Sequence, residues 1–583
     1  MYFEKTNVVE EELKEFTQKI QGFLKGEYPQ EKFKPRRLMQ GVYGQRQPGV
    51  QMMRIKVPGG ELTPEQWRAI ADISTDYGSH NMHITTRQDI QLHFVKLAEV
   101  PDILNRLANV GLTTREACGN SFRNVTASPF SGSLRDEVFD VRPAVEACAQ
   151  FFLRNPETQA LPRKFKVAFS ESDADYAVTG MHDVGAIAKV KDGVPGFKVV
   201  VGGGLGSQPF PAAVYREFLP ATEFMKHLFA IARIFNKHGN REKRMKARIK
   251  FLVHQTWGVE KFLEETQKEV ERIEQENISF PEIPTPMVAA EDFDYSNPFS
   301  EADGKIYHWF EKNVFPTKRK NEYMIVVHVP LGDISPEVAK KLADYHEEWN
   351  KNKAEFLTVT DDQNLVLKGI VIEEGNKKSA FTQIYETLEE LNLGYVGYHN
   401  FADPVSCPGT TTCNLGITSS HGMAEAIRQI IGDKWATDPR FATATLHMSG
   451  CPNSCGRHHI ATVGFFGRSE LLSGNIQAPA YTVLLGGANL GNGEIRLARK
   501  CGKILAKRVP AYIEKLISIY EEKAAEGQSF DDFCANFPTD EAKALVKSFD
   551  KAAMPIEDKE KINYDWGKDK PYVVEFGEGE CAS

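Results

Sequence analysis

Residues 52–74 read MMRIKVPGGELTPEQWRAIADIS and residues 324–346 read MIVVHVPLGDISPEVAKKLADYH, so one pattern occurs twice in the chain. Each copy is a β-rich run, a Pro-x-Gly turn, a Thr-Pro-Glu or Ser-Pro-Glu helix start and an amphipathic helix. A hydroxyl residue before proline suits a helix N-cap, with proline in the first helical position. The repeat predicts an internally duplicated fold.

The repeat continues further along the chain. ITTRQDIQLH at 84–93 matches VTDDQNLVLK at 359–368, and each predicts an alternating strand. Helices with apolar spacing follow, and GFKVVVGGGLG at 196–206 then pairs with AYTVLLGGANLG at 480–491. These units predict an α+β fold with mostly antiparallel sheets, in which a pseudo-twofold axis relates the two halves.

Length and composition narrow the class of protein. A chain of 583 residues is too long for one core, and 41% hydrophobic with 26% charged residues is typical of a soluble globular protein. The net charge of −8 argues against nucleic-acid binding. The opening MYFEKTNVVEEELKEF is acidic and lacks the apolar run of an export signal. No stretch has the length of a membrane helix, so we expect a cytoplasmic protein.

Two cysteine pairs stand in the second copy. Cys407 and Cys413 lie in SCPGTTTC, and Cys451 and Cys455 lie in GCPNSCGR. Four thiolates in two local pairs can hold an iron–sulfur cluster, because each iron needs a soft anionic ligand. Proline after the first cysteine of each pair, with glycine nearby, favours a tight turn that brings both sulfurs to one face.

Other interpretations of these cysteines are weaker. A structural zinc site usually has closer pairs than C-x5-C with C-x3-C, and unliganded buried cysteines remain an alternative. Disulfides are not expected in a reducing cytosol. The remaining cysteines show no pairing pattern and are interpreted as ordinary thiols: Cys118, Cys148, Cys501, Cys534 and Cys581.

The two copies differ in charge. Arg54 aligns with Val326, and Arg87 aligns with Asp362, so the first copy keeps cations where the second does not. Lys164 and Lys166 flank Phe165, and period two would point both ammonium groups to one face. Any single cation is more often a surface group, but the asymmetry predicts a basic cavity in the first half. The group comprises Arg54, Arg87, Arg123, Arg163, Lys164, Lys166, Arg244, Arg248 and Lys250. A pseudo-twofold would bring this cavity against the cysteines at the interface of the halves.

The GGGLG segment at 202–206 is not a dinucleotide-binding fingerprint. Pro209 stands where its last glycine should be, and no helix is expected to open there. We find no nicotinamide or flavin site in the sequence, so electrons are expected from another protein.

The motifs TTRQDIQLH, FRNV, LPRKFK, GGGLG and GCPNSCGR, with the duplication and the cysteine pairs, resemble the sulfite and nitrite reductases that contain sirohaem and a 4Fe–4S cluster. The resemblance covers residues from about 40 to about 500, and is nearest to the assimilatory, ferredoxin-dependent sulfite reductase hemoproteins. It implies a ferredoxin-like segment and a larger α/β segment in each half, with the cofactors at the interface.

The predicted segments follow from the duplication and this resemblance. They are an N-terminal extension (1–40), a first ferredoxin-like half-repeat (41–135), a first sirohaem-binding α/β domain (136–278), a proline-rich acidic linker (279–300), a second ferredoxin-like half-repeat (301–400), a 4Fe–4S and sirohaem α/β domain (401–507), and a C-terminal helix with an extended tail (508–583).

The resemblance also implies roles for individual residues. Cys407, Cys413, Cys451 and Cys455 would ligate the cluster, and Cys455 would also bridge it to the sirohaem iron. Residues that match those around the open axial position are Arg54, Arg123, Lys164 and Lys166. Arg87, Gln91 and Arg248 match residues that meet the sirohaem carboxylates, and Asn453 matches the residue between the last two ligands. Such cations suit a cofactor with many carboxylates, and they supply charge and protons as oxygens leave as water.

The same scaffold serves sulfite and nitrite. The family's sulfite reductases have lysine two residues beyond the first lysine of LPRK, whereas its nitrite reductases tend to have asparagine there. Lys166 therefore favours sulfite, a dianion that loses three oxygens, and nitrite is the alternative. An electron-transfer protein without haem and a zinc-stabilised anion-binding scaffold are further alternatives, although neither explains the basic half.

Two expectations concern the surroundings of the site. His83 stands where flavoprotein-coupled hemoproteins have arginine, which weakens one expected contact to a cofactor carboxylate. The donor is expected to be a small acidic ferredoxin, with the basic runs 34–37 and 317–320 as docking points. The duplication is compatible with a monomer, because one chain already supplies both halves of the interface.

Overall fold

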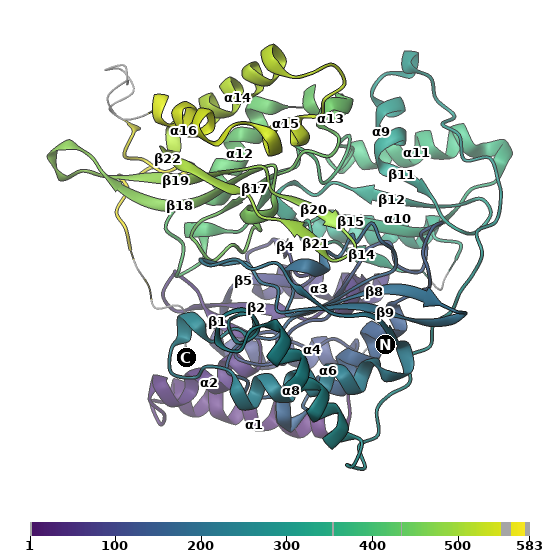
Figure 1. The fold of residues 1–583 in the computed structure, drawn as a ribbon, viewed down its shortest axis with the longest axis vertical. Coiled ribbons are helices and arrows are strands. Elements are labelled where there is room, and N and C mark those ends of the chain that lie inside the picture. The colour runs from purple at the N-terminus through teal and green to yellow at the C-terminus, as the bar shows by residue number, and fades with distance from the viewer. Residues whose placement is uncertain (1–2, 353–354, 433, 550–560, 576, 578–583) are drawn as a thin grey trace.

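The computed structural model describes residues 3–352, 355–432, 434–549, 561–575 and 577 (Figure 1). The first half of the chain lies mainly in the lower part of the view and the second half in the upper part. Among the helices of these residues, none is long and apolar enough to cross a membrane.

Two five-stranded antiparallel sheets carry the first parts of the repeat, and each takes one strand from the other half. The first has the order β1 (Val42–Gly44), β2 (Val50–Ile55), β5 (Ile90–Lys96), β4 (Met82–Ile84) and β13 (Asp333–Ile334). The second has the order β11 (Val314–Pro316), β12 (Glu322–Val327), β15 (Leu365–Val371), β14 (Leu357–Val359) and β3 (Glu61–Leu62). The exchange of β3 and β13 joins the halves through backbone hydrogen bonds.

The Pro-x-Gly turn before each exchanged strand requires glycine in its last position, because the backbone of the other half passes close by. A Cβ on Gly60, at φ +78°, would lie 2.2 Å from the Val359 carbonyl oxygen, and one on Gly332, at φ +73°, would lie 2.6 Å from that of Ile84. The Gln88 side chain donates to that Val359 oxygen at 3.1 Å, and Gln363 donates to that Ile84 oxygen at 3.0 Å. The two crossings therefore repeat the same contacts, as the pseudo-twofold predicts.

The amphipathic helices of the repeat pack against each other between the halves. They are α3 (Pro64–Tyr77) and α10 (Pro336–Trp349), each with proline in the first turn. Thr63 accepts from the Gln66 amide in a capping box, and Ser335 accepts from the Val338 amide, which confirms the predicted helix starts. The buried Trp67 indole donates to the Ala339 carbonyl at 2.8 Å.

Two further five-stranded sheets form the larger segments. One has the order β10 (Ala213–Pro220), β9 (Val194–Val201), β8 (Val184–Lys191), β7 (Val167–Ser170) and β6 (Thr126–Ala127). The other has the order β16 (Val405–Ser406), β17 (Leu446–Ser449), β18 (Val463–Leu471), β19 (Gln477–Leu485) and β22 (Arg499–Leu505). The three strands at the β6 and β16 ends run parallel, and the other pairings of these sheets are antiparallel, so the prediction of mostly antiparallel sheets is confirmed.

Helices cover these sheets and the ends of the chain. They are α1 (Asn7–Leu24), α2 (Gln30–Met39), α4 (Val100–Asn109), α5 (Arg142–Phe152), α6 (Ala221–His238), α8 (Val259–Ile273), α9 (Lys305–Asn313), α11 (Lys377–Glu390), α12 (Ser420–Ile431), α14 (Val509–Lys523), α15 (Phe530–Asn536) and α16 (Thr539–Ser548). The short helices are α7 (Ile249–Phe251) and α13 (Lys434–Thr437), and a hairpin joins β20 (Ala488–Gly491) to β21 (Glu494–Arg496). The expected C-terminal helix is α14, but α15 and α16 follow it, because Phe530, Phe533, Ala542 and Val546 join the same core.

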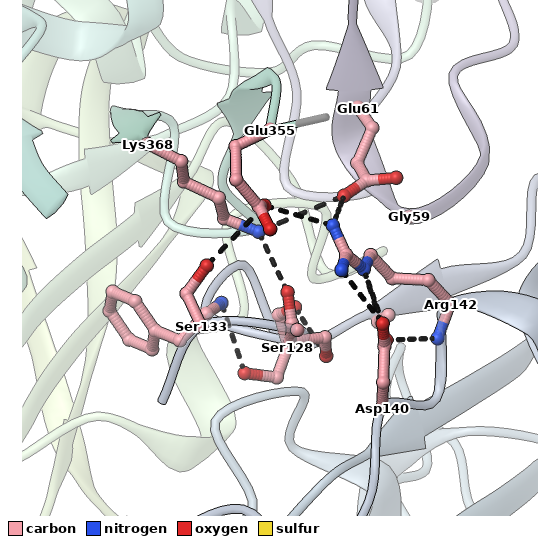
Figure 2. Close-up of polar contacts among 12 residues, drawn as sticks. Gly59, Glu61, Ser128, Ser133, Asp140, Arg142, Glu355 and Lys368 are labelled. Carbon is pink, nitrogen blue, oxygen red and sulfur yellow. Dashed lines mark hydrogen bonds and ion pairs between the residues drawn. The ribbon is translucent and has the colours of Figure 1, made fainter. Parts of the chain in front are cut away.

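An ion network fills the place beside β3 (Figure 2). Arg142, at the start of α5, contacts Asp140 at 2.7 Å, Glu355 at 2.9 Å and Glu61 at 3.4 Å. The buried Lys368 ammonium donates to the Ser131 carbonyl at 2.9 Å and lies 3.8 Å from Glu61. Since each buried charge has partners of opposite sign, the network ties the two halves together here.

The repeat places different chemistry at the equivalent position beside β13. Glu61 of β3 corresponds to Asp333 of β13, and Lys368 corresponds to His93. Asp333 hydrogen-bonds His83, and the cysteine-bearing segment approaches from that side. The position beside β3 is thus filled by ion pairs within the chain, whereas the equivalent position beside β13 lies next to the cysteine-bearing segment.

Candidate active site

The first cysteine of each pair follows one of two adjacent parallel strands. Cys407 comes directly after β16, and Cys451 follows β17 after one glycine. Because parallel strands end at the same edge of a sheet, the two pairs start side by side. Cys413 and Cys455 are exposed, whereas Cys451 is buried, and the described cysteines form no disulfide.

The polar surroundings of the thiols suit anionic sulfur. The Gly450 amide donates to Cys407 Sγ at 3.3 Å. Burial raises the pKa of Cys407, and the neighbouring Cys455 raises it further. Burial and the three other cysteines raise the pKa of Cys451. Bound iron would stabilise the deprotonated thiolates despite this burial. Hydrogen bonds from N–H groups to the sulfurs help to set the reduction potential of such clusters.

The spacing of the sulfurs disfavours a single zinc ion. Tetrahedral zinc with Zn–S bonds of about 2.3 Å needs sulfurs about 3.8 Å apart. Over the residues that the structure describes, His83, Asp333 and His421 are the one set of three metal-binding side chains with donor atoms within 4.8 Å of one another. No three of the cysteine sulfurs are that close, as expected for ligands on separate irons of a cluster.

Two of the predicted cations converge on one carbonyl. Arg54 Nη1 donates to the Ala117 oxygen at 3.4 Å, and Arg123 Nη1 donates to the same oxygen at 2.7 Å. Arg123 also donates to the Gly119 oxygen from Nε and Nη2. Gln91, the register partner of Arg54 between β2 and β5, accepts from its Nη2 at 2.7 Å in the amide orientation that satisfies both side chains.

The cysteine half meets the basic half at the turn that carries Arg87. The Thr86 hydroxyl donates to the Cys455 carbonyl at 2.8 Å, and Arg457 Nη2 donates to the Thr86 carbonyl at 3.4 Å. Arg87 donates to the Asn124 carbonyl at 2.6 Å and to the Thr126 hydroxyl at 3.0 Å. Burial lowers the pKa of Arg87 to about 10. The continuous strand predicted over 84–93 is wrong, because residues 85–89 form this turn between β4 and β5.

The two lysines of LPRKFK lie at the entrance to β7. Phe165 is fully buried, and Lys164 and Lys166 are both partly exposed, so the predicted alternation is confirmed although β7 begins only at Val167. Burial lowers the pKa of Lys166, and Lys164, Arg87 and Arg248 lower it further, against an opposing contribution from Asp183. An ammonium group with a lowered pKa is a better proton donor near neutral pH.

The glycine-rich loop is held from both halves. The Lys250 ammonium donates to the carbonyls of Gly204, Leu205 and Gln208, at 2.5–3.2 Å. Burial and Arg248 lower the pKa of Lys250 to about 7. The His459 ring hydrogen-bonds the Gly206 carbonyl at 2.8 Å, and Gly206 faces the backbone of the exposed Asn453. The segment after this loop is β10, which agrees with rejecting a dinucleotide site.

Other residues of the predicted group lie apart or serve elsewhere. Arg244 is exposed on the surface, and Arg163 contacts Asn120. Within the predicted docking run 317–320, the structure contradicts the role of Lys318, which is only 2% exposed and pairs with Glu137, while Arg319 pairs with Glu322 and Glu355. Arg37 is also buried and donates to Gln51, which leaves Arg36 as an exposed cation of the run 34–37.

His83 links the first half to a cysteine segment. Its Nδ1 lies 2.7 Å from Asp333 Oδ1, His421 Nε2 lies 3.5 Å from Asp333 Oδ2, and His421 Nδ1 hydrogen-bonds the Cys407 carbonyl at 3.1 Å. Burial opposes ionisation of Asp333, but the two histidines outweigh it and lower its pKa. The His83 imidazole therefore has the carboxylate of Asp333 as its partner.

Three residues of the site were missed from the sequence. Arg457 pairs with Asp361 at 2.9 Å, and Asp183 receives Arg248 at 2.7 Å. Arg457 stands two residues after Cys455 in GCPNSCGR, a signal that was available. Asp183 is a single acid with no motif around it, and Asp361 lies in the repeat segment 359–368, where nothing marks it as the partner of Arg457. The buried Arg457 Nε has no hydrogen-bond acceptor among the described residues, so one donor is left for an anionic group.

The remaining thiols fit the prediction of ordinary cysteines. Cys118, Cys148, Cys501 and Cys534 are buried and form no disulfide, and burial raises the pKa of Cys148. Cys581 lies outside the described residues.

Comparisons with known proteins agree with this architecture. A family model described as the nitrite and sulphite reductase 4Fe-4S domain matches residues 118–274, and one described as the nitrite/sulfite reductase ferredoxin-like half domain matches residues 43–110 and 316–376. The chain therefore contains domains of the nitrite and sulfite reductase type. The second model matches once in each half, which confirms the duplicated α+β fold.

Individual relatives are similar over most of their length. Sulfite reductase (ferredoxin) 1 of Mycolicibacterium paratuberculosis is 29% identical over 82% of this chain and 81% of its own. Ferredoxin–nitrite reductase of Synechococcus elongatus is 28% identical over 76% of this chain and 80% of its own. The solved structure of the Mycobacterium tuberculosis NirA protein superimposes with a TM-score of 0.73 at 25% identity, over 88% of this chain and 92% of that one.

Proposed function

We propose that this protein reduces sulfite to sulfide with six electrons, at a sirohaem iron coupled through the Cys455 thiolate to a 4Fe–4S cluster, and that ferredoxin supplies the electrons. The proposed cluster ligands are Cys407, Cys413, Cys451 and Cys455. We include a cytoplasmic location, since clusters and free thiols need reducing conditions.

One observation carries the proposal: the segment of the last cysteine is hydrogen-bonded to the turn of the basic half. Thr86 donates to the Cys455 carbonyl at 2.8 Å, and Arg87 is the next residue. A macrocycle that bears carboxylates would find thiolate and guanidinium ligands together there. The spare Arg457 Nε and the group of Arg54, Arg87, Gln91, Arg123 and Arg248 fit such a cofactor, and Asn453 would border it.

The cofactors would supply the redox chemistry, and the protein residues would bind, orient and protonate the substrate. Arg54 and Arg123 are joined through the Ala117 carbonyl and would hold the oxyanion. Lys164 and Lys166 would donate protons as oxygen leaves as water, because crowding by other cations eases the loss of an ammonium proton. Cys413 is exposed, so it would be the ligand on the side where electrons enter.

Absorption spectroscopy tests the proposal directly. The purified protein should show Soret and red bands of sirohaem, iron in excess of one atom per chain, and a spectral change when sulfite is added. Zinc without iron would contradict it, and a cluster spectrum without a macrocycle would favour an electron-transfer protein.

Nitrite reduction to ammonia on the same cofactors is the second candidate, because relatives with nitrite reductase names are almost as similar as those with sulfite reductase names. Lys166 favours sulfite, since a second ammonium group beside Lys164 suits a dianion. Turnover of both anions, measured side by side with a chemical reductant, decides between them.

The donor would dock near Cys413. The Asn414 side chain donates to the Gly44 carbonyl of β1, and β1 packs on α2, where Arg36 is exposed. Arg36→Glu should raise the KM for ferredoxin and leave turnover with a chemical reductant unchanged. Lys320→Glu, at the exposed end of the run 317–320, is the matched control. An effect of Lys320→Glu without one of Arg36→Glu would contradict this docking site.

A further inference from the structure

Asp183 is a fully buried acid inside the cationic part of the site. Its Oδ1 accepts from Arg248 Nη2 at 2.7 Å and from Nε at 3.1 Å, and its Oδ2 accepts from the Lys166 amide at 2.9 Å. A buried carboxylate is costly unless it is paired and hydrogen-bonded, and both of its oxygens are used here. Neither the motifs nor the resemblance assigns it a role.

The duplication contains a reference for this position. Lys166 leads into β7 and Asp183 into β8, while Thr445 leads into β17 and Thr462 into β18. The Thr445 amide donates to the Thr462 hydroxyl at 3.0 Å, as the Lys166 amide donates to Asp183. The Gly202 amide donates to the Asp183 carbonyl at 2.9 Å, and the Gly486 amide donates to that of Thr462 at 2.8 Å.

A neutral hydroxyl therefore suffices to complete this backbone junction. The second half has no carboxylate at this junction, and it also lacks the surrounding cations of the first half. We therefore attribute the negative charge of Asp183 to those cations. The charges that act on the pKa of Lys166 are those of Lys164, Arg87, Arg248 and Asp183, and Lys166 in turn lowers the pKa of His182. Among these residues, Asp183 alone is acidic.

We propose that Asp183 is a positioning residue, which fixes the Arg248 guanidinium and supplies the negative neighbour that keeps Lys166 charged among the cations of the site. The inference rests on the proposed function for its catalytic meaning, because a protonated Lys166 matters only if an oxyanion is reduced there. The effect of Asp183 on the charge of the Lys166 ammonium group does not depend on that function.

The pKa of Lys166 offers a test that does not need turnover. In Asp183→Asn and in Asp183→Thr, which copies the second half, removal of the charge should lower this pKa by about one unit. Competitive acetylation of the holoenzyme over a pH series, followed by peptide mass spectrometry, measures the titration of each lysine. Thr462→Val is the matched control at the equivalent junction, and it should leave the Lys166 titration in place.

A second measurement connects the charge to the anion. Sulfite binding to the oxidised holoenzyme, followed by the absorption shift, should weaken about tenfold at the upper end of the pH range in both Asp183 variants, because Lys166 loses its proton earlier. Absence of turnover in the wild type, with the Lys166 shift still present, would refute the proposed function and not the role of Asp183.

Three outcomes would overturn the inference. An unchanged Lys166 titration in Asp183→Asn and Asp183→Thr would show that the carboxylate serves only the backbone. An equal shift in Thr462→Val would show a nonspecific change. Failure of both Asp183 variants to fold, while Thr462→Val folds, would show that the acid is needed for the fold itself.

Discussion

The Thr86 hydroxyl and the Cys455 carbonyl, 369 residues apart in sequence, are hydrogen-bonded at 2.8 Å. This bond joins the turn that carries Arg87 to the last cysteine of the second half. Arg457 strengthens the contact, because it donates to the Thr86 carbonyl and pairs with Asp361. Any group that bridges the two halves of the site must lie next to this junction.

Cys455→Ser should lose the iron-dependent visible spectrum and lower sulfite turnover more than tenfold, because a hydroxyl does not replace a soft thiolate ligand. Iron content and the absorption spectrum of the purified variant measure the effect. Cys501→Ser, at a buried cysteine of β22, is the control and should keep both. Full iron content and an unchanged spectrum in Cys455→Ser would refute the shared ligand.

Lys166→Asn should lower kcat/KM for sulfite by about tenfold to a hundredfold, and lower that for nitrite less, because it removes one positive charge and one proton donor. The ratio of the two rates, measured with the same chemical reductant, is the readout. Lys191→Asn alters an exposed lysine at the end of β8 and should leave the ratio unchanged. A ratio that does not move in Lys166→Asn would remove the argument for sulfite.

Arg142→Met should lower the free energy of unfolding by about 3–5 kcal/mol, since it removes the cation that pairs with Asp140 and one of the two cations beside each of Glu61 and Glu355. Thermal unfolding monitored by circular dichroism gives the comparison. Arg440→Met breaks an exposed pair with Asp438 and should cost at most about 1 kcal/mol. Adding Asp140→Asn to Arg142→Met should recover part of the loss, because it removes the acid that Arg142 neutralises; no recovery would mean that the network is not electrostatic.

Glu171 makes the stability of the fold depend on pH. It is fully buried, and this burial raises its pKa to about 7, although Ser128 and Ser131 donate to it. The folded pKa lies above the unfolded one, so the folded state holds the proton more tightly. The stabilisation is complete below about pH 4.5 and is lost as pH rises through about 7.

Glu171→Gln should therefore flatten this part of the stability curve by about 2–3 kcal/mol between pH 5 and pH 8. Unfolding midpoints of the wild type and the variant at both pH values supply the measurement. Glu526→Gln, at an exposed position, should follow the wild type. Parallel curves for the wild type and Glu171→Gln would show that Glu171 does not titrate in this range.

Several parts of the site were predictable because they are local patterns. The helix starts at Thr63 and Ser335, the turning glycines Gly60 and Gly332, and the alternation around Phe165 all depend on near neighbours in sequence. The expected strand through Arg87 failed, because apolar alternation does not reveal that residues 85–89 turn. The docking role of Lys318 failed because its partner, Glu137, is 181 positions away.

The sequence by itself determined that the fold is duplicated, that the thiols stand in one copy and that the cations stand in the other, since repetition and composition are properties of the chain. Only the tertiary structure decided how the copies meet. The exchange of β3 and β13, the pairing of Asp183 with Arg248 and the contact of Thr86 with Cys455 join distant residues. Such contacts depend on how buried charges and backbone groups find partners once the halves have closed, and no local pattern encodes that choice.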